Sequence, residues 1–144
     1  MSDLMAAHAA SRRVDVFFYG LFMDESMLRD QGLQPQRAEQ ASVDGFALQI
    51  GQRATLVPSA GSSVHGMVFS LTLAELSRLY SEPGVQAYRP HAVLARLPDG
   101  QSVPALCYSL PSPSLSEPNP EYAAKLRAVA EKVRLPRAYI DSLR

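Results

Sequence analysis

The chain has 144 residues, 47% of them hydrophobic, so it is long enough to bury one substantial core. Fourteen Lys and Arg residues balance fourteen Asp and Glu, and the arginines form no stripe with aromatic residues, which argues against nucleic acid as a partner. A single cysteine excludes internal disulfides, and no apolar run or N-terminal leader pattern indicates a membrane partner, so we expect a cytoplasmic protein.

The N-terminal part predicts a tail, a strand and a short helix. Residues 1–13 read as a frayed or helical tail. β-Branched and aromatic residues fill 14–19, which is typical of a buried strand that stops at Gly20. Asp24 then caps a helix to about Asp30. A glycine between strand and helix leaves backbone N–H groups free to face an anion, although an ordinary strand-to-helix turn gives the same pattern.

The middle of the chain predicts further strands and a second helix. Strands are expected at 42–50, 54–58 and 64–71, with a turn around Gly61. Thr72 and Glu75 have the spacing of a capping box, because the Thr hydroxyl accepts from the backbone of Glu75 while the Glu side chain reaches back. A helix should therefore run from about Leu73 to Tyr80.

One carboxylate follows this helix directly. Pro83 disfavours helical geometry at Glu82, and Pro83 with Gly84 suits the central pair of a type II turn. Glu82 should then lie near the negative end of the helix dipole, among apolar neighbours such as Leu79 and Val85. Both conditions disfavour an ionised carboxylate and suit a general base. A solvated surface glutamate is the alternative.

The C-terminal part predicts two more strands and two helices. The strands cover 88–97 and 102–110, joined by a hairpin at Pro98, Asp99 and Gly100. Cys107 lies in the second of these strands and is expected to be a buried, inert thiol.

A proline-rich stretch follows. Residues 111–120 contain four prolines and read as an extended connector. Asn119 with Pro120 suits the start of a helix that runs to about Val133, and a last helix covers 137–143. One N-terminal strand, a strand-rich middle and terminal helices predict an α+β fold.

Several of these segments together resemble the γ-glutamylcyclotransferase-like (AIG2-like) family. Residues 19–23 are similar to its N-terminal signature, a Tyr-Gly followed by a small hydroxyl residue and an apolar pair. Residues 79–85 are similar to its Leu-Asp-x-x-Glu-Gly segment, in which the Glu is the catalytic acid/base. Weaker matches lie at 53–58, 64–69 and 88–89. The resemblance covers about 14–110, with an extension through Tyr122 and 135–140.

The resemblance implies a fold and a division of the chain. It implies a small mixed β-barrel with flanking helices, with the site at one end. The N-terminal tail (1–13) then precedes a barrel domain (14–110), and the proline-rich connector and C-terminal helices (111–144) follow it.

It also implies a reaction and the residues that perform it. A γ-glutamyl group is cyclised to 5-oxoproline, releasing an amine or amino acid, with Glu82 as general acid/base. The substrate-binding residues are Tyr19, Gly20, Leu21, Phe22, Arg53 and Tyr88. This chemistry needs no metal or organic cofactor, and the three histidines have no partners at metal-ligand spacing.

Two departures from the family pattern leave alternatives open. Leu21 stands where the family has Ser or Thr, so a hydroxyl contact to substrate is missing, and Pro83 is inserted between Glu82 and Gly84. The chain is then either a cyclotransferase, a related transferase or lyase acting on γ-glutamyl amines, or a non-catalytic binding protein of the same fold. The leaving amine and the oligomeric state are not specified by the sequence.

Overall fold

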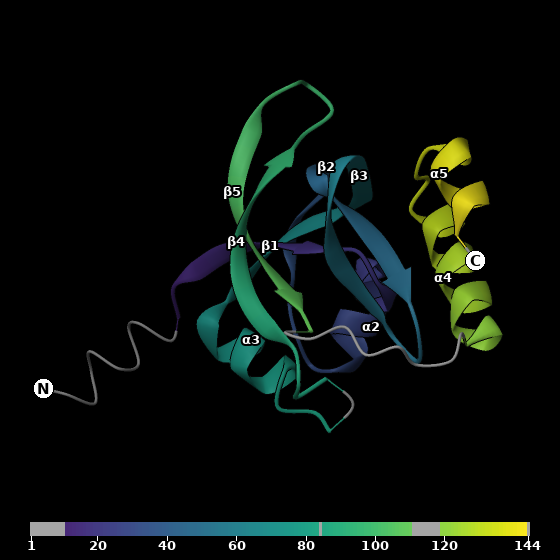
Figure 1. The fold of residues 1–144 in the computed structure, drawn as a ribbon. Coiled ribbons are helices and arrows are strands. Elements are labelled where there is room, and N and C mark those ends of the chain that lie inside the picture. The colour runs from purple at the N-terminus through teal and green to yellow at the C-terminus, as the bar shows by residue number, and fades with distance from the viewer. Residues whose placement is uncertain (1–10, 84, 111–118, 144) are drawn as a thin grey trace, which may run out of the picture.

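A computed structural model describes residues 11–83, 85–110 and 119–143, in which five strands close into a barrel with helices packed around it (Figure 1). The strands are β1 (Arg13–Phe18), β2 (Gln36–Ile50), β3 (Ala54–Thr72), β4 (Arg89–Arg96) and β5 (Ser102–Ser109). The helices are the short 3-10 helix η1 (Leu21–Met23), α2 (Glu25–Asp30), α3 (Leu73–Leu79), α4 (Pro120–Lys132) and α5 (Arg137–Ser142). The expected α+β fold with a small mixed barrel and flanking helices is confirmed.

The barrel closes between its first and last strands. The strand order is β1-β3-β2-β4-β5, in which β2 with β3 and β4 with β5 form antiparallel hairpins. β1 is antiparallel to β3 but parallel to β5, where Val16 pairs with Leu106. This closure brings the ends of β1 and β5, far apart in sequence, to the same end of the barrel.

Strand β1 is apolar and buried from Val16 to Phe18 because both of its faces are covered there. Side chains alternate across a strand. Phe17 belongs to the cluster that fills the barrel, together with Val68 and Cys107. Val16 and Phe18 belong to a second cluster, which the helices share. The burial of Cys107, expected from its apolar strand, is confirmed.

The helices cover the outside of the barrel and complete the second cluster. Leu28 of α2, Leu76 of α3 and Leu126 of α4 are at most 2% exposed within it. Helices α4 and α5 lie together along one side of the barrel (Figure 1). Both start signals read from the sequence are present: Asp24 caps α2, and Thr72 with Glu75 forms a capping box at α3.

The β2–β3 hairpin differs from expectation. Residues 54–58 and 64–71 belong to one strand, β3, and its partner β2 begins at Gln36 rather than near Ser42. The turn predicted around Gly61 is a bulge: Asp44 pairs with Ser63 and Phe46 with Pro58, so residues 59–62 lie opposite Gly45 alone. The glycine and serines that indicated a turn therefore interrupt the register without ending the strand.

Parts of two predicted segments lie outside the described residues. The predicted tail includes Arg13, which begins β1, while residues 1–10 and 111–118 are not described. Asn119 caps α4 as predicted by accepting from the backbone N–H of Tyr122. In the described ranges, none of the helices has the length and apolar character needed to cross a membrane.

Candidate active site

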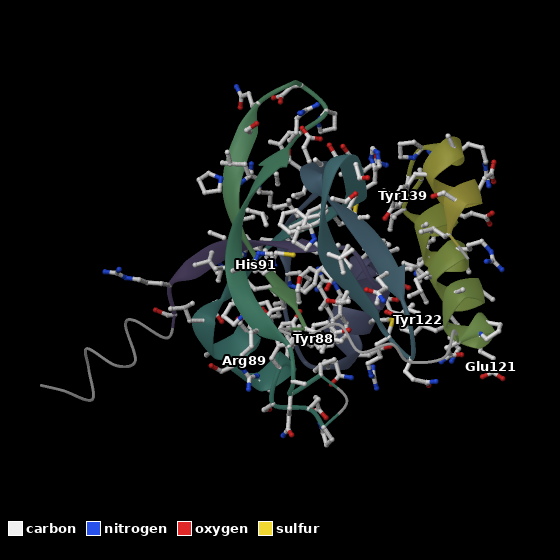
Figure 2. The ribbon with its side chains drawn as sticks, in the orientation of Figure 1. Tyr88, Arg89, His91, Glu121, Tyr122 and Tyr139 are labelled. Atoms are coloured by element: carbon white, nitrogen blue, oxygen red, sulfur yellow. The ribbon has the colours of Figure 1, made fainter. Side chains whose placement is uncertain are left out.

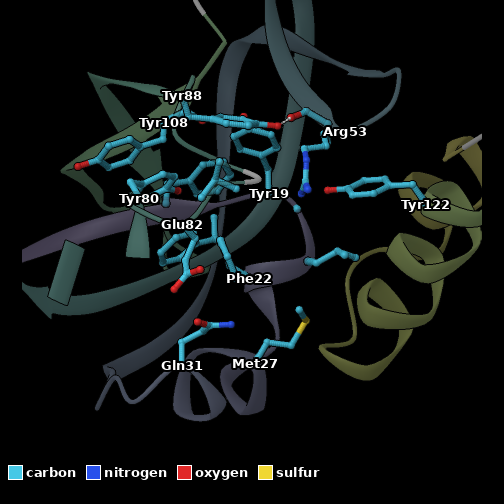
Figure 3. A pocket seen from close by; sticks show the side chains of 16 residues that line it. Tyr19, Phe22, Met27, Gln31, Arg53, Tyr80, Glu82, Tyr88, Tyr108 and Tyr122 are labelled. Carbon is cyan, nitrogen blue, oxygen red and sulfur yellow. Dashed lines mark hydrogen bonds between the residues drawn. The ribbon is translucent and has the colours of Figure 1, made fainter. Parts of the chain in front are cut away.

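A cavity of about 280 Å³ opens at the end of the barrel where β1 and β5 finish (Figure 3). Its wall is built by the β1–η1 connection, the start of β3, the loop between α3 and β4, the end of β5 and the helix α4. The seven residues expected from the sequence all line it: Tyr19, Gly20, Leu21, Phe22, Arg53, Glu82 and Tyr88. The fold thus brings the predicted site together, while the roles of these residues remain proposals.

Tyrosines dominate the wall. Five of the six in the chain line the cavity: Tyr19, Tyr80, Tyr88, Tyr108 and Tyr122. Tyr19 donates its hydroxyl to the backbone oxygen of Tyr108 at 2.7 Å, and Tyr88 donates to that of Ala54. The rings of Tyr80 and Tyr108 stack with centroids 3.8 Å apart. These contacts hold four of the five tyrosines in place.

The tyrosine hydroxyls are neutral. Burial is the main cause that raises the pKa of all five. They keep their protons through the neutral pH range, so the tyrosines add no charge to the cavity.

Two charged side chains stand among the described lining residues, Arg53 and Glu82. Both are exposed at the mouth, and Figure 3 shows them on different sides of it. None of the described carboxylates forms an ion pair with Arg53. A cation and an anion across an aromatic cavity suit a ligand that carries both charges, such as an amino acid head group.

The position of Glu82 corrects one expectation. The turn is present, since the N–H of Val85 donates to the carbonyl of Glu82 at 3.0 Å. The side chain is exposed, however, rather than surrounded by apolar neighbours. Leu79, at 1% exposed, turns into the core where α3 ends, and the following turn carries Glu82 outward to the rim. The prediction that this carboxylate is desolvated is therefore wrong.

Gly20 is needed for a reason other than the one expected. Its φ of −108° is open to other residues, so conformational freedom does not require glycine there. A Cβ atom at this position would lie 3.0 Å from the hydroxyl oxygen of Tyr122, which comes from α4. Glycine leaves room for that hydroxyl.

Sequence reasoning missed part of the wall. The sequence predicts Tyr80 only as the end of a helix, and it does not predict a lining role for Tyr108, for Met27 of α2 or for Gln31 just after α2. Tyr122 entered only as an extension of the family resemblance. The available signal was the number of tyrosines at the ends of predicted elements, but their convergence depends on barrel closure.

Within the described ranges, no three His, Cys, Asp or Glu side chains are grouped so as to hold a metal ion. We therefore assign no metal ligands.

The fold and the cavity define a small-barrel protein with a tyrosine-lined site at one end. The family model for gamma-glutamyl cyclotransferase, AIG2-like proteins matches residues 16–127. The chain belongs to this family, and the resemblance seen in the sequence is confirmed.

Solved structures agree on the fold. The chain is 21% identical to a gamma-glutamyl cyclotransferase, with a TM-score of 0.80 over 92% of this chain and 86% of that one. An uncharacterized human protein has a TM-score of 0.76 at 22% identity, covering 91% and 86%. YkqA from Bacillus subtilis has a TM-score of 0.75 at 21% identity, covering 99% of this chain and 56% of that one. Comparison with curated proteins finds no match.

Proposed function

We propose that the protein is a γ-glutamyl cyclotransferase that converts a γ-glutamyl compound into 5-oxoproline and a free amine or amino acid. The observation that carries this proposal is the placement of Glu82 and Arg53 at the mouth of one tyrosine-lined cavity, in a chain of this family. A small-molecule substrate in the cytoplasm is part of the proposal.

The reaction is an intramolecular aminolysis. The carboxylate of Glu82 accepts a proton from the α-ammonium of the glutamyl group, and the freed amine forms a C–N bond with the γ-carbonyl carbon. The resulting oxyanion collapses as the original C–N bond breaks, and Glu82 returns the proton to the leaving nitrogen. The ring nitrogen releases its second surplus proton to become the lactam N–H, and the free amine takes up this proton as an ammonium. Because the nucleophile and the carbonyl belong to one group, the protein mainly has to hold the folded conformer.

Each remaining residue has a positioning role in this scheme. Arg53 pairs with the α-carboxylate of the substrate, since none of the described carboxylates neutralises it. The backbone of Gly20, Leu21 and Phe22 contacts the glutamyl group, and Tyr19 and Tyr88 form the wall. Exposure of Glu82 at the mouth allows it to reach an ammonium group on a bound substrate.

The test of this proposal is 5-oxoproline release by the wild type and Glu82→Gln from a panel of γ-glutamyl compounds. Glutamine keeps the size of the side chain but cannot accept the ammonium proton. General base catalysis is worth about 10²–10⁴-fold, so turnover should fall by that order while the thermal midpoint changes little. The matched control is Glu25→Gln, a partly exposed glutamate of α2 that lies outside the cavity and pairs with Arg29, and this variant should keep wild-type turnover.

The same panel addresses the second candidate, a binding protein without catalysis. The exposed position of Glu82 favours this candidate, because a general base is usually less solvated. A wild type that binds 5-oxoproline but releases none from any compound would support it. Full turnover in folded Glu82→Gln would contradict the mechanism.

A further inference from the structure

One hydroxyl on the cavity wall differs from the others in its hydrogen bonding. The protons of Tyr19 and Tyr88 are committed to backbone oxygens of the barrel. The hydroxyl of Tyr122, by contrast, reaches the β1–η1 connection, where a Cβ atom on Gly20 would lie 3.0 Å from its oxygen, and it donates to none of the described residues. Burial raises the pKa of this phenol, and the nearby backbone N–H groups of Ala54 and Leu21 act in the opposite direction. These groups are donors, so they leave the phenol proton to be donated elsewhere.

No acceptor for that proton is present on the wall. Among the described residues, none accepts a hydrogen bond from Tyr122. Tyr122 lies on α4 (Figure 2), and its hydroxyl is directed at the cavity on the side of Arg53 (Figure 3). The Arg53 guanidinium is close enough to act on the Tyr122 phenol by its charge. An O–H donor and a cation thus face one space, with no anion of the described chain between them.

Two further charged side chains lie near this pair. Glu121 and Lys125 of α4 line a second pocket that Tyr122 and Arg53 also line. Glu121 forms no ion pair with Arg53 in the described part of the chain. The Tyr122 hydroxyl and the Arg53 guanidinium are therefore placed to bind an anionic group of a ligand.

We propose that Tyr122 is a substrate-binding residue that donates a hydrogen bond to the α-carboxylate of the glutamyl group, beside Arg53. The identity of the ligand rests on the proposed function. The oxygen of Tyr122 lies beside Gly20, so its hydroxyl presents a donor next to the backbone that is proposed to contact the glutamyl group. It also supplies, from α4, a hydroxyl at the loop where residue 21 itself has none.

The product allows this inference to be tested without catalysis. 5-Oxoproline retains the carboxylate, whereas 2-pyrrolidinone is the same lactam without it. Dissociation constants for both ligands are measured by NMR titration with the wild type and Tyr122→Phe. A hydrogen bond to a charged group predicts that the variant loses about 10–100-fold in affinity for 5-oxoproline and little for 2-pyrrolidinone. Tyr139→Phe, which removes a hydroxyl outside the cavity, should change neither value.

A second variant keeps the test decisive if Tyr122→Phe is poorly folded. Gly20→Ala adds a Cβ atom 3.0 Å from the Tyr122 oxygen and should displace the hydroxyl while retaining it. This variant should likewise lower the affinity for 5-oxoproline more than the affinity for 2-pyrrolidinone. In the double variant the two effects should not add, because the alanine then has no hydroxyl to displace.

The outcomes separate this inference from the proposed function. Unchanged 5-oxoproline affinity in Tyr122→Phe, an equal loss for both ligands, or a wild type that binds neither would overturn the carboxylate role. A wild type that shows the expected ligand discrimination but no turnover would overturn the enzymatic proposal alone. Where turnover is present, Tyr122→Phe should raise KM by a similar factor and change kcat less.

Discussion

At the scale of single residues, two glycines of β3 are required for opposite reasons. A Cβ atom at Gly66 would lie 2.1 Å from the backbone oxygen of Phe18, because β1 and β3 approach closely just before β1 leads into the cavity. Gly61 has open space around it but a φ of +81°, which disfavours other residues. Replacing Gly66 therefore tests steric overlap with β1, and replacing Gly61 tests backbone strain.

Gly66→Ala should therefore destabilise the protein more than Gly61→Ala. Overlap with backbone cannot be relieved by a rotamer change, so we expect a loss of about 3 kcal/mol or more for Gly66→Ala. Strain alone should cost about 1–2 kcal/mol for Gly61→Ala. Urea unfolding followed by circular dichroism gives both values. Equal losses would mean that β1 and β3 separate easily at this point.

At the scale of elements, helix α4 is fixed at both ends. The Oδ1 atom of Asn119 accepts from the N–H of Tyr122 at 3.2 Å, and its Nδ2 donates to the carbonyl of Gln52 at 3.4 Å, next to Arg53. At the other end, Lys132 pairs with Asp24 at 2.8 Å. Asn119 thus connects the helix that carries Tyr122 to the turn that carries Arg53.

Two substitutions at Asn119 separate these contacts. Asn119→Ala removes the cap and should lower the free energy of unfolding by about 1 kcal/mol. Asn119→Asp keeps the capping oxygen and should retain most of this stability, while losing the donor to Gln52. Thermal and urea unfolding of the three proteins measure the difference. A large loss in Asn119→Asp would show that the Gln52 contact matters more than the cap.

At the scale of the whole molecule, the sequence predicted what local patterns determine. The strand expected at 14–19, the caps at Asp24 and Thr72 and the hairpin at 98–100 depend on neighbouring residues. All are present, with β1 at Arg13–Phe18 and buried from Val16 onward. The continuous β3 was missed because a bulge and a turn use the same residue types.

The site shows the same division. The family resemblance led to seven residues that do share one cavity. It did not give the outward direction of Glu82 or the arrival of Tyr108 and Tyr122, which depend on the parallel closure of β1 on β5 and on the packing of α4. Such contacts join residues far apart in the chain, and no local pattern encodes them.

The packed fold should also make stability depend on pH near neutrality. Burial lowers the pKa of His65, with Asp44 acting in the opposite direction, and burial lowers the pKa of His91. In the unfolded chain both should titrate near about 6.5. The unfolded state therefore binds more protons between that value and the lower folded pKa values, so stability rises with pH in this window.

We expect the free energy of unfolding to be fully retained above about pH 6.5 and to fall as the pH decreases through that value. Urea unfolding between about pH 5 and 7.5 should show this slope, and the double substitution His65→Gln with His91→Gln should reduce it, whatever its effect on absolute stability. At Asp24 and Glu75 burial raises the pKa, but hydrogen bonds together lower it by more, so both carboxylates have lowered pKa values. Their contribution to stability is therefore lost only at about pH 4 and below, outside the window of the histidines. An equal slope in the double variant would show that these histidines accept protons as readily in the folded protein as in the unfolded chain.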